Sequence, residues 1–208
     1  MSKRKGDESG KMKLALVGLG LMLLADIVAD LTLFIGEINL VHWCELGVTG
    51  LAWILVIIGL LNLRHERKEF ARGFIASIIG VLGILAQAFF VYKNISVGLE
   101  EGAFMAMKPM FTEYVSDLAM LFVLYMLVRG TGQLLAKGGM MDVAKKSIRK
   151  SNLDPIIAMV AMVLIPFGTA FSMPISIIIG AVGIVINAAM RLDMINYINS
   201  AIKMEDLD

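Results

Sequence analysis

Residues 14–36 read LALVGLGLMLLADIVADLTLFIG, an apolar run that carries two aspartates, Asp26 and Asp30. A helix needs about 20 apolar residues to cross the hydrocarbon core of a bilayer, so this run predicts a membrane span. A carboxylate at mid-depth is costly unless it is protonated, paired or hydrated. Asp26 and Asp30 are one helical turn apart and therefore share a face. The rest of the chain is expected to bury this acidic face against protein or around a hydrated cavity.

The composition of the whole chain is that of a membrane protein. It has 208 residues, of which 58% are hydrophobic, whereas a soluble domain is about 45–50% apolar. A single all-α membrane domain is expected, with no second globular domain. The formal net charge of +1 provides no basic face for nucleic acid. The single cysteine, Cys44, excludes an internal disulfide and a cysteine-rich metal site, and we predict no cofactor.

Apolar runs separated by polar links predict a polytopic protein with six transmembrane helices. The spans are 14–36, 46–63, 73–92, 115–135, 155–171 and 175–190, with a basic tail at 1–13 and a polar tail at 191–208. The basic segment 137–152 is expected to form a short helix on the membrane surface. Because the last two runs are short and Pro166 interrupts the fifth, 155–190 forms either two full spans or a hairpin that enters and returns. The combined length favours two spans.

The basic residues predict the orientation of the chain. All of the 19 Lys and Arg residues except Lys93, Lys108 and Arg129 fall in the two tails and in the links after the second and fourth spans. By the positive-inside rule, both termini lie inside. We expect a multi-pass protein of the plasma membrane, the inner membrane of a bacterium. Arg191 is expected to mark the membrane edge, and Arg129 to reach the inner interface or pair with an acid on a neighbouring span.

Small residues recur at helical spacing in three spans. In lipid, such residues let helix backbones approach closely. We interpret the stripes as packing seams; alternatively, the amides that end two of them face a polar cavity. The stripes are Gly47 and Gly50 in the second span, Ala76, Gly80, Gly83 and Gln87 in the third, and Gly180, Gly183, Asn187 and Arg191 in the sixth.

The fourth span adds two carboxylates, Glu113 and Asp117, again one turn apart. Because the first and fourth spans run in opposite directions, Asp117 is expected at the depth of Asp30. Clustered carboxylates in a membrane are protonated or hold a cation, as in transporters coupled to protons or sodium. Alternatively, they form a structural pair or are hydrated near the interface. The predicted substrate- or ion-binding residues are Asp26, Asp30, Gln87, Asp117 and Asn187.

The sequence carries no enzymatic motif. It has no H-E-x-x-H zinc motif, no G-x-S-x-G elbow and no P-loop, and an aspartyl protease pair would lack its flanking glycine signature. Soft ligands for Cu(I) occur in the predicted outer links: His42, Cys44, Met105, Met107 and Met110. Because the chain has 16 methionines and methionine commonly fills apolar cores, we predict no metal site and no enzyme.

These features predict a small secondary transporter, or the substrate-binding membrane subunit of one, for a proton, a cation or a cationic solute. The size and helix count are similar to those of the substrate-capture subunits of energy-coupling-factor importers, and Ala25 and Ala29 are spaced like the small-residue helix contact of those subunits. The alternative is a non-transporting assembly, regulatory or immunity subunit. Its basic segment 137–150 would dock anionic lipid or an acidic partner, and its aspartates would pair with a partner's cations.

The expected partners are therefore the lipid bilayer, a small solute or cation, and further protein subunits or a second copy of the chain. The surroundings of Asp26 and Asp30 distinguish the two hypotheses. Burial within the chain's own bundle favours transport, whereas exposure toward lipid favours a partner subunit.

Overall fold

The computed structural model describes residues 2–32, 39–97, 102–168 and 173–205, with side chains described for 10–28, 43–92, 114–163, 175 and 177–204. Apart from short turns, this part of the chain is helical, as predicted, and contains no strand. Its six helices are α1 (Ser2–Thr32), α2 (Asn39–Leu63), α3 (Lys68–Val97), α4 (Gly102–Lys137), α5 (Met141–Gly168) and α6 (Met173–Glu205).

Four of these helices are long and apolar enough to cross a membrane. The qualifying segments are Trp43–Leu63, Lys68–Tyr92, Tyr114–Lys137 and Ile177–Met204. Large apolar side chains such as Ile75, Leu85 and Val185 are exposed on the outside of the bundle. Exposed apolar surface of this extent is typical of contact with lipid or with other proteins. The helices therefore indicate a membrane protein.

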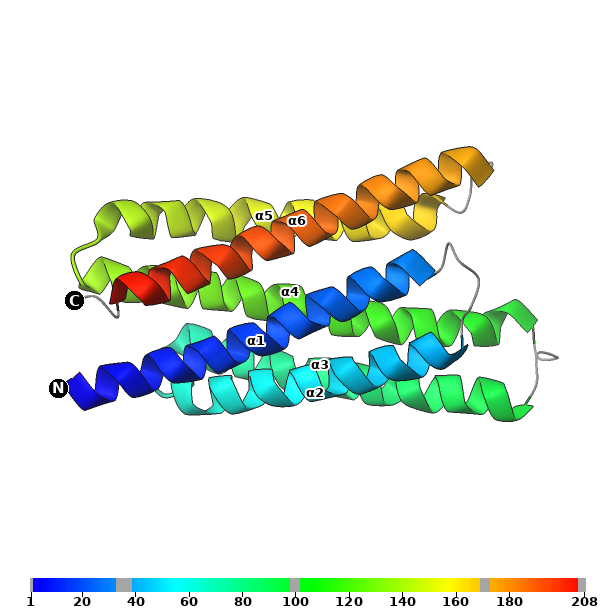
Figure 1. Ribbon diagram of the computed structural model, residues 1–208, viewed down its shortest axis with the longest axis horizontal. Helices are drawn as coiled ribbons and strands as arrows, with labels where there is room; N and C mark the ends of the chain where they lie inside the picture. Colours follow the sequence, from blue (N-terminus) through cyan, green and yellow to red (C-terminus); the bar gives the residue numbers. More distant parts are fainter. Residues whose placement is uncertain (1, 33–38, 98–101, 169–172, 206–208) are drawn as a thin grey trace.

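The helices form a bundle in which neighbours along the chain pack against each other (Figure 1). Helix α1 packs against α2 and α6, and α4 packs against α3, α5 and α6. The two chain ends lie at the same end of the bundle, together with the α2–α3 and α4–α5 connections (Figure 1). The bundle thus gathers the helix ends that carry its basic segments at one end.

A close contact between small residues joins α1 to α2. A methyl group added to Gly18 would lie 2.6 Å from the carbonyl oxygen of Ala52, and one added to Gly59 would lie 2.8 Å from the Cβ of Ala15. Only glycine permits these backbones to approach so closely. The contact places α1, with its aspartates, directly against α2.

The prediction that Gly47 and Gly50 form the packing seam of α2 was wrong. A methyl group at Gly47 or Gly50 would meet nothing within 4 Å. The face of α2 that packs on α1 instead carries Ala52, Val56 and Gly59, which follow one another at helical spacing. Because α2 is apolar on all sides, its sequence pattern does not indicate which face turns inward.

Trp53 fixes the position of α2 relative to α3 and α4. Its indole ring lies directly over Gly80, where an added methyl group would collide with the ring. The indole Nε1 donates a hydrogen bond to Ser116 Oγ at 3.0 Å. Trp53 is completely buried, so this contact sets the depth of Ser116, and with it of the following Asp117, in the bundle.

The segment after α4 differs from the expected surface helix. After a turn in which Gly139 has a φ of +89°, α5 begins at Met141 and continues without a break into the predicted fifth span. Ser147 Oγ donates to the carbonyl oxygen of Val128 at 2.7 Å and thereby ties α5 to α4. The exposed lysines of this segment therefore form one face of a helix whose other face is packed in the bundle.

Helix α6 also continues beyond the predicted end of its span. It runs to Glu205, and the hydroxyl of Tyr197 donates to the carbonyl oxygen of Val143 at 3.0 Å. Lys150 forms ion pairs with Asp154 and Asp193. Both α5 and α6 run the length of the bundle (Figure 1), which the two-span interpretation of 155–190 requires.

We expect Gly59→Ala to destabilise the protein by about 1–3 kcal/mol, because the added methyl group overpacks the α1–α2 contact. Gly50→Ala is the matched control on the same helix: it meets nothing within 4 Å and gains helix propensity. Thermal unfolding of the detergent-purified variants measures both effects. Equal melting temperatures for the two variants would contradict the close contact.

Candidate functional site

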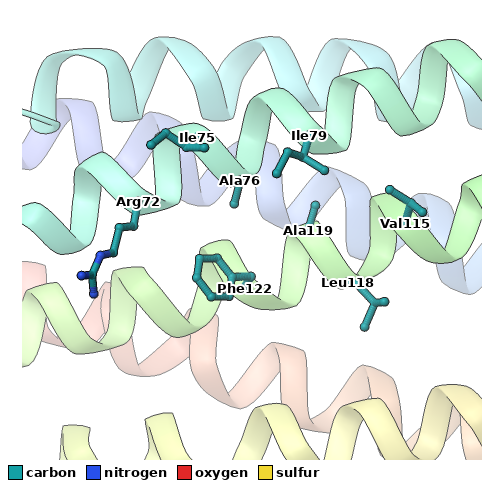
Figure 2. Close-up of a pocket in the computed structure, with 8 residues that line it drawn as sticks. All are labelled: Arg72, Ile75, Ala76, Ile79, Val115, Leu118, Ala119 and Phe122. Atoms are coloured by element: carbon teal, nitrogen blue, oxygen red, sulfur yellow. The ribbon is translucent and has the colours of Figure 1, made fainter.

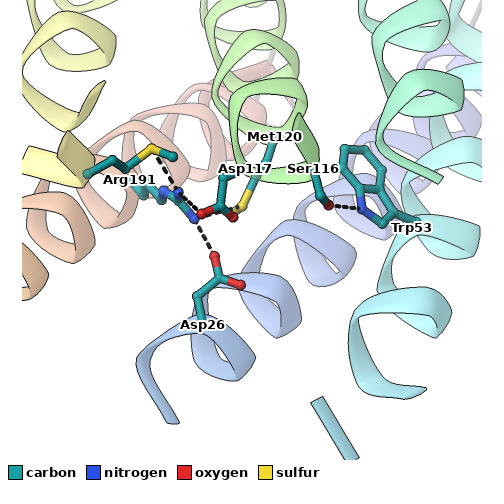
Figure 3. Close-up of polar contacts among 7 residues, drawn as sticks. Asp26, Trp53, Ser116, Asp117, Met120 and Arg191 are labelled. Carbon is teal, nitrogen blue, oxygen red and sulfur yellow. Dashed lines mark hydrogen bonds and ion pairs between the residues drawn. The ribbon is translucent and has the colours of Figure 1, made fainter. Parts of the chain in front are cut away.

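A completely buried arginine lies in the interior of the bundle. Arg191, on α6, has 0% of its side chain exposed. An isolated guanidinium ion in such a place would cost many kcal/mol of desolvation, so a buried charge is paired with a countercharge in stable proteins. Asp26 from α1 and Asp117 from α4 provide that charge (Figure 3). We call these three residues the Asp–Arg–Asp triad.

The two aspartates bind different nitrogens of the guanidinium group. Arg191 Nη1 donates to Asp26 Oδ2, and Nη2 lies 3.6 Å from Asp117 Oδ2. Two thioether sulfurs also lie close to the guanidinium group, with Met120 Sδ 3.2 Å from Nη1 and Met162 Sδ 3.5 Å from Nη2. The arginine is thus held by side chains from α1, α4 and α5 (Figure 3).

The local packing positions each carboxylate of the triad. Asp26 lies on α1, one turn from the buried residues Met22 and Leu23 that pack in the core. Asp117 directly follows Ser116, whose hydroxyl accepts the hydrogen bond from Trp53. Because α1, α4 and α6 each contribute one charged residue, their relative positions determine whether the triad can form.

The triad contains one more negative than positive charge when both carboxylates are ionised. Its arginine is fully buried, whereas the side chains of Asp26 and Asp117 are 18% and 21% exposed. Chemically, the triad is suited to take up one proton, one monovalent cation or the positive group of a solute.

Two other residues of the predicted site are described: Asn187, which lies one turn from Arg191, and Gln87, which lies on a different helix. Asn187 precedes Arg191 by one turn on α6 and is buried, and its Oδ1 has no hydrogen-bond partner in the described part of the chain. Gln87 is buried on α3, which packs against α2 and α4. No hydrogen bond or ion pair joins Gln87 to the triad among the described residues.

Several predicted ligands fall outside the described side chains. Asp30 lies in the last turn of α1, but its side chain is not among those described. The same applies to Glu113 and to most of the soft ligands considered for copper: His42, Met105, Met107 and Met110. Cys44 is described and is exposed. Within the described side chains, no group of three His, Cys, Asp or Glu residues is placed to hold a metal ion.

Burial of Arg191 inside the bundle was not predicted from the sequence. The helix continues for several turns beyond it, and its side chain turns into the core. One signal was present in the sequence, because Arg191 extends the stripe of Gly180, Gly183 and Asn187, all of which are buried. Arg129, in contrast, is exposed, and its Nη1 donates to the hydroxyl of Tyr125 at 2.5 Å.

Comparisons with known proteins identify no relative: no protein-family model matches the chain, and no curated protein or solved structure is similar to it. Any functional conclusion must therefore come from the chain's own residues.

We expect Arg191→Met to destabilise the protein by about 2–4 kcal/mol, because it leaves two partly buried carboxylates without their countercharge. Asp26→Asn should cost much less, since Arg191 keeps Asp117 as its ionic partner and the introduced amide can still accept a hydrogen bond. Chemical unfolding in detergent measures both losses, with the exposed Lys203→Met on the same helix as control. A larger loss for Asp26→Asn than for Arg191→Met would contradict this charge balance.

Proposed function

We propose that the protein is a small membrane transporter, or the substrate-binding membrane subunit of one, and that the Asp–Arg–Asp triad binds a proton, a monovalent cation or a cationic solute. The observation that carries this proposal is the excess of one carboxylate over the buried guanidinium of Arg191. We further propose that all six helices cross the plasma membrane of a bacterium with both termini inside, and that the chain is not itself an enzyme.

The excess negative charge of the triad favours ion binding over a purely structural role. A single aspartate would neutralise Arg191 and leave no charge to compensate. The second carboxylate is costly in a protein interior unless something positive joins it for part of the time. A proton or a cation would supply that charge, and its arrival and departure would change the electrostatic balance among α1, α4 and α6.

The origin of the three charges supports a role in conformational change. The residues come from three different helices, so adding a cation alters the attraction between elements that can shift relative to each other. Transporters commonly place their ion sites between helix groups that move against one another. The weaker Arg191–Asp117 contact, at 3.6 Å, is the one that a bound cation would most readily replace.

The surroundings of the aspartates also bear on the choice between the two hypotheses. Asp26 and Asp117 both pair with an arginine of their own chain. A partner protein is therefore not needed to supply a positive charge to them. Burial of Asp26 and Asp30 within the chain's own bundle is the criterion that favours transport; Asp26 meets this criterion, and the side chain of Asp30 lies outside the described residues.

The alternative function, a non-transporting assembly, regulatory or immunity subunit, has one observation in its favour. Lys145, Lys146 and Arg149 are all exposed along one face of the first turns of α5. Such a basic face at the end of the bundle that gathers the chain termini would suit an acidic partner protein. In that case the triad would act only as a structural link between helices.

Ligand-dependent stability tests the proposed site. We expect either acidification or one of sodium, potassium and choline to raise the melting temperature of the detergent-purified protein. A ligand that binds only the folded state stabilises by about 2.7 kcal/mol at one hundred times its Kd, which corresponds to several degrees. Asp26→Asn and Asp117→Asn should each abolish the rise, because either substitution removes the excess negative charge.

Asp142→Asn is the matched control, because it also removes one carboxylate but from an exposed position at the start of α5. It should leave the ligand-dependent rise unchanged. If no ligand stabilises the wild type, and both triad variants fold as well as it does, the transport proposal fails and the partner-subunit alternative is favoured. A rise that both triad variants retain would place the ion site elsewhere.

A further inference from the structure

A groove of about 500 Å³ lies between α3 and α4 on the outside of the bundle (Figure 2). Its walls are almost entirely apolar and include exposed side chains of Ile75, Ile79, Leu118 and Phe122. Its floor is formed by the small side chains of two alanines, Ala76 and Ala119. The groove therefore exists because each helix has a small residue where the two helices meet.

One end of the groove carries a positive charge. Arg72 lies at that end (Figure 2) and is exposed. In the described part of the chain, Arg72 forms no ion pair. The nearest acid on its own helix, Glu69, is buried and accepts a hydrogen bond from Gln133 Nε2 at 3.0 Å. The guanidinium group of Arg72 is thus available to an external anion.

A second arginine lies at a similar level on α4. The register of the two helices follows from Gly73, where an added methyl group would lie 3.5 Å from the Cβ of Met126, and from the neighbouring contact of Gly130 with the ring of Phe70. Because α3 and α4 run in opposite directions, Arg129 falls near the level of Arg72.

Arg129 also shares a face of α4 with the groove. It follows Phe122 by two helical turns, and both side chains are exposed. One of its nitrogens donates to Tyr125, and the guanidinium group lies 5.8 Å from the centre of the same ring. A guanidinium group has five N–H donors, so Arg129 keeps donors for another ligand.

We propose that this groove binds one anionic phospholipid, with an acyl chain along its apolar walls and the phosphate group at Arg72 and Arg129. The proposal depends on the membrane location of the bundle but not on the transport function. The residues involved are separate from the triad, so the two proposals can fail independently.

The size and charge of the groove support this occupant. A methylene group occupies roughly the volume of a water molecule, about 30 Å³, so the groove has room for most of one acyl chain. An apolar peptide would satisfy the walls but not the two arginines. The two cations lie at the end of the bundle that carries the basic links, and basic residues near a membrane surface attract anionic lipid head groups.

Native mass spectrometry of the full chain in detergent tests the proposal with two lipids of identical acyl chains, phosphatidylglycerol and phosphatidylcholine. We expect phosphatidylglycerol to bind more tightly. The double substitution Arg72→Gln/Arg129→Gln should weaken its binding roughly 10- to 30-fold and weaken phosphatidylcholine binding much less, because the positive choline group offsets the phosphate charge of that lipid. The control Lys146→Gln/Arg149→Gln removes two exposed cations at the same end of the bundle. It should change the Kd for phosphatidylglycerol much less than the groove double substitution does.

Two additional measurements distinguish binding of a whole lipid from binding of its phosphate group alone. Ile79→Ser/Leu118→Ser changes only exposed groove residues, so the protein should fold, and it should weaken phosphatidylglycerol binding by removing contacts with the acyl chain. Glycerol phosphate, which has the charged group without acyl chains, should not compete. Equal affinity for both lipids, an unchanged Kd in either groove variant, or effective competition by glycerol phosphate would overturn the proposal.

Discussion

Burial of the Arg191 guanidinium group is the constraint on which the arrangement of the bundle depends. A charge with no solvent exposure needs ionic partners within reach of its nitrogens, and the nearest acid on α6, Asp193, is exposed and pairs with Lys150 instead. Asp26 and Asp117 therefore have to arrive from α1 and α4. Three helices that are distant in sequence are fixed at one depth by this requirement, in addition to the packing of their apolar side chains.

The packing around the triad allows those charges to meet. Gly18 and Gly59 bring α1 close to α2, and Trp53 links α2 to α3 and α4 through Gly80 and Ser116. The triad is thus a charged cluster inside a bundle that is held mainly by close contact of small and large apolar residues and by single hydrogen bonds such as that between Trp53 and Ser116. Its second carboxylate is the one feature that packing alone does not require, and this excess charge motivates the proposed ion site.

The sequence predicted the number and order of the helices because each contains an apolar run, but α1 and α5 also extend over polar segments, from Ser2 and from Met141. It also singled out Asp26 and Asp117 as interior carboxylates. It did not identify Arg191 as their partner. A span predicted from hydropathy ends at the first charged residue, whereas α6 continues through Arg191 to Glu205. The seam on α2 was misplaced for a related reason: a helix that is apolar all round does not reveal its inward face until its neighbours are known.

Infrared difference spectroscopy of the carboxyl groups tests the central claim most directly. Spectra of the purified protein would be compared with and without the cation, or the pH change, that stabilises it. We expect the ligand to change a carboxyl band that is altered in both Asp26→Asn and Asp117→Asn, because the two aspartates share one excess charge. A ligand-induced change that is identical in the wild type and both variants would contradict a cation site at the Asp–Arg–Asp triad.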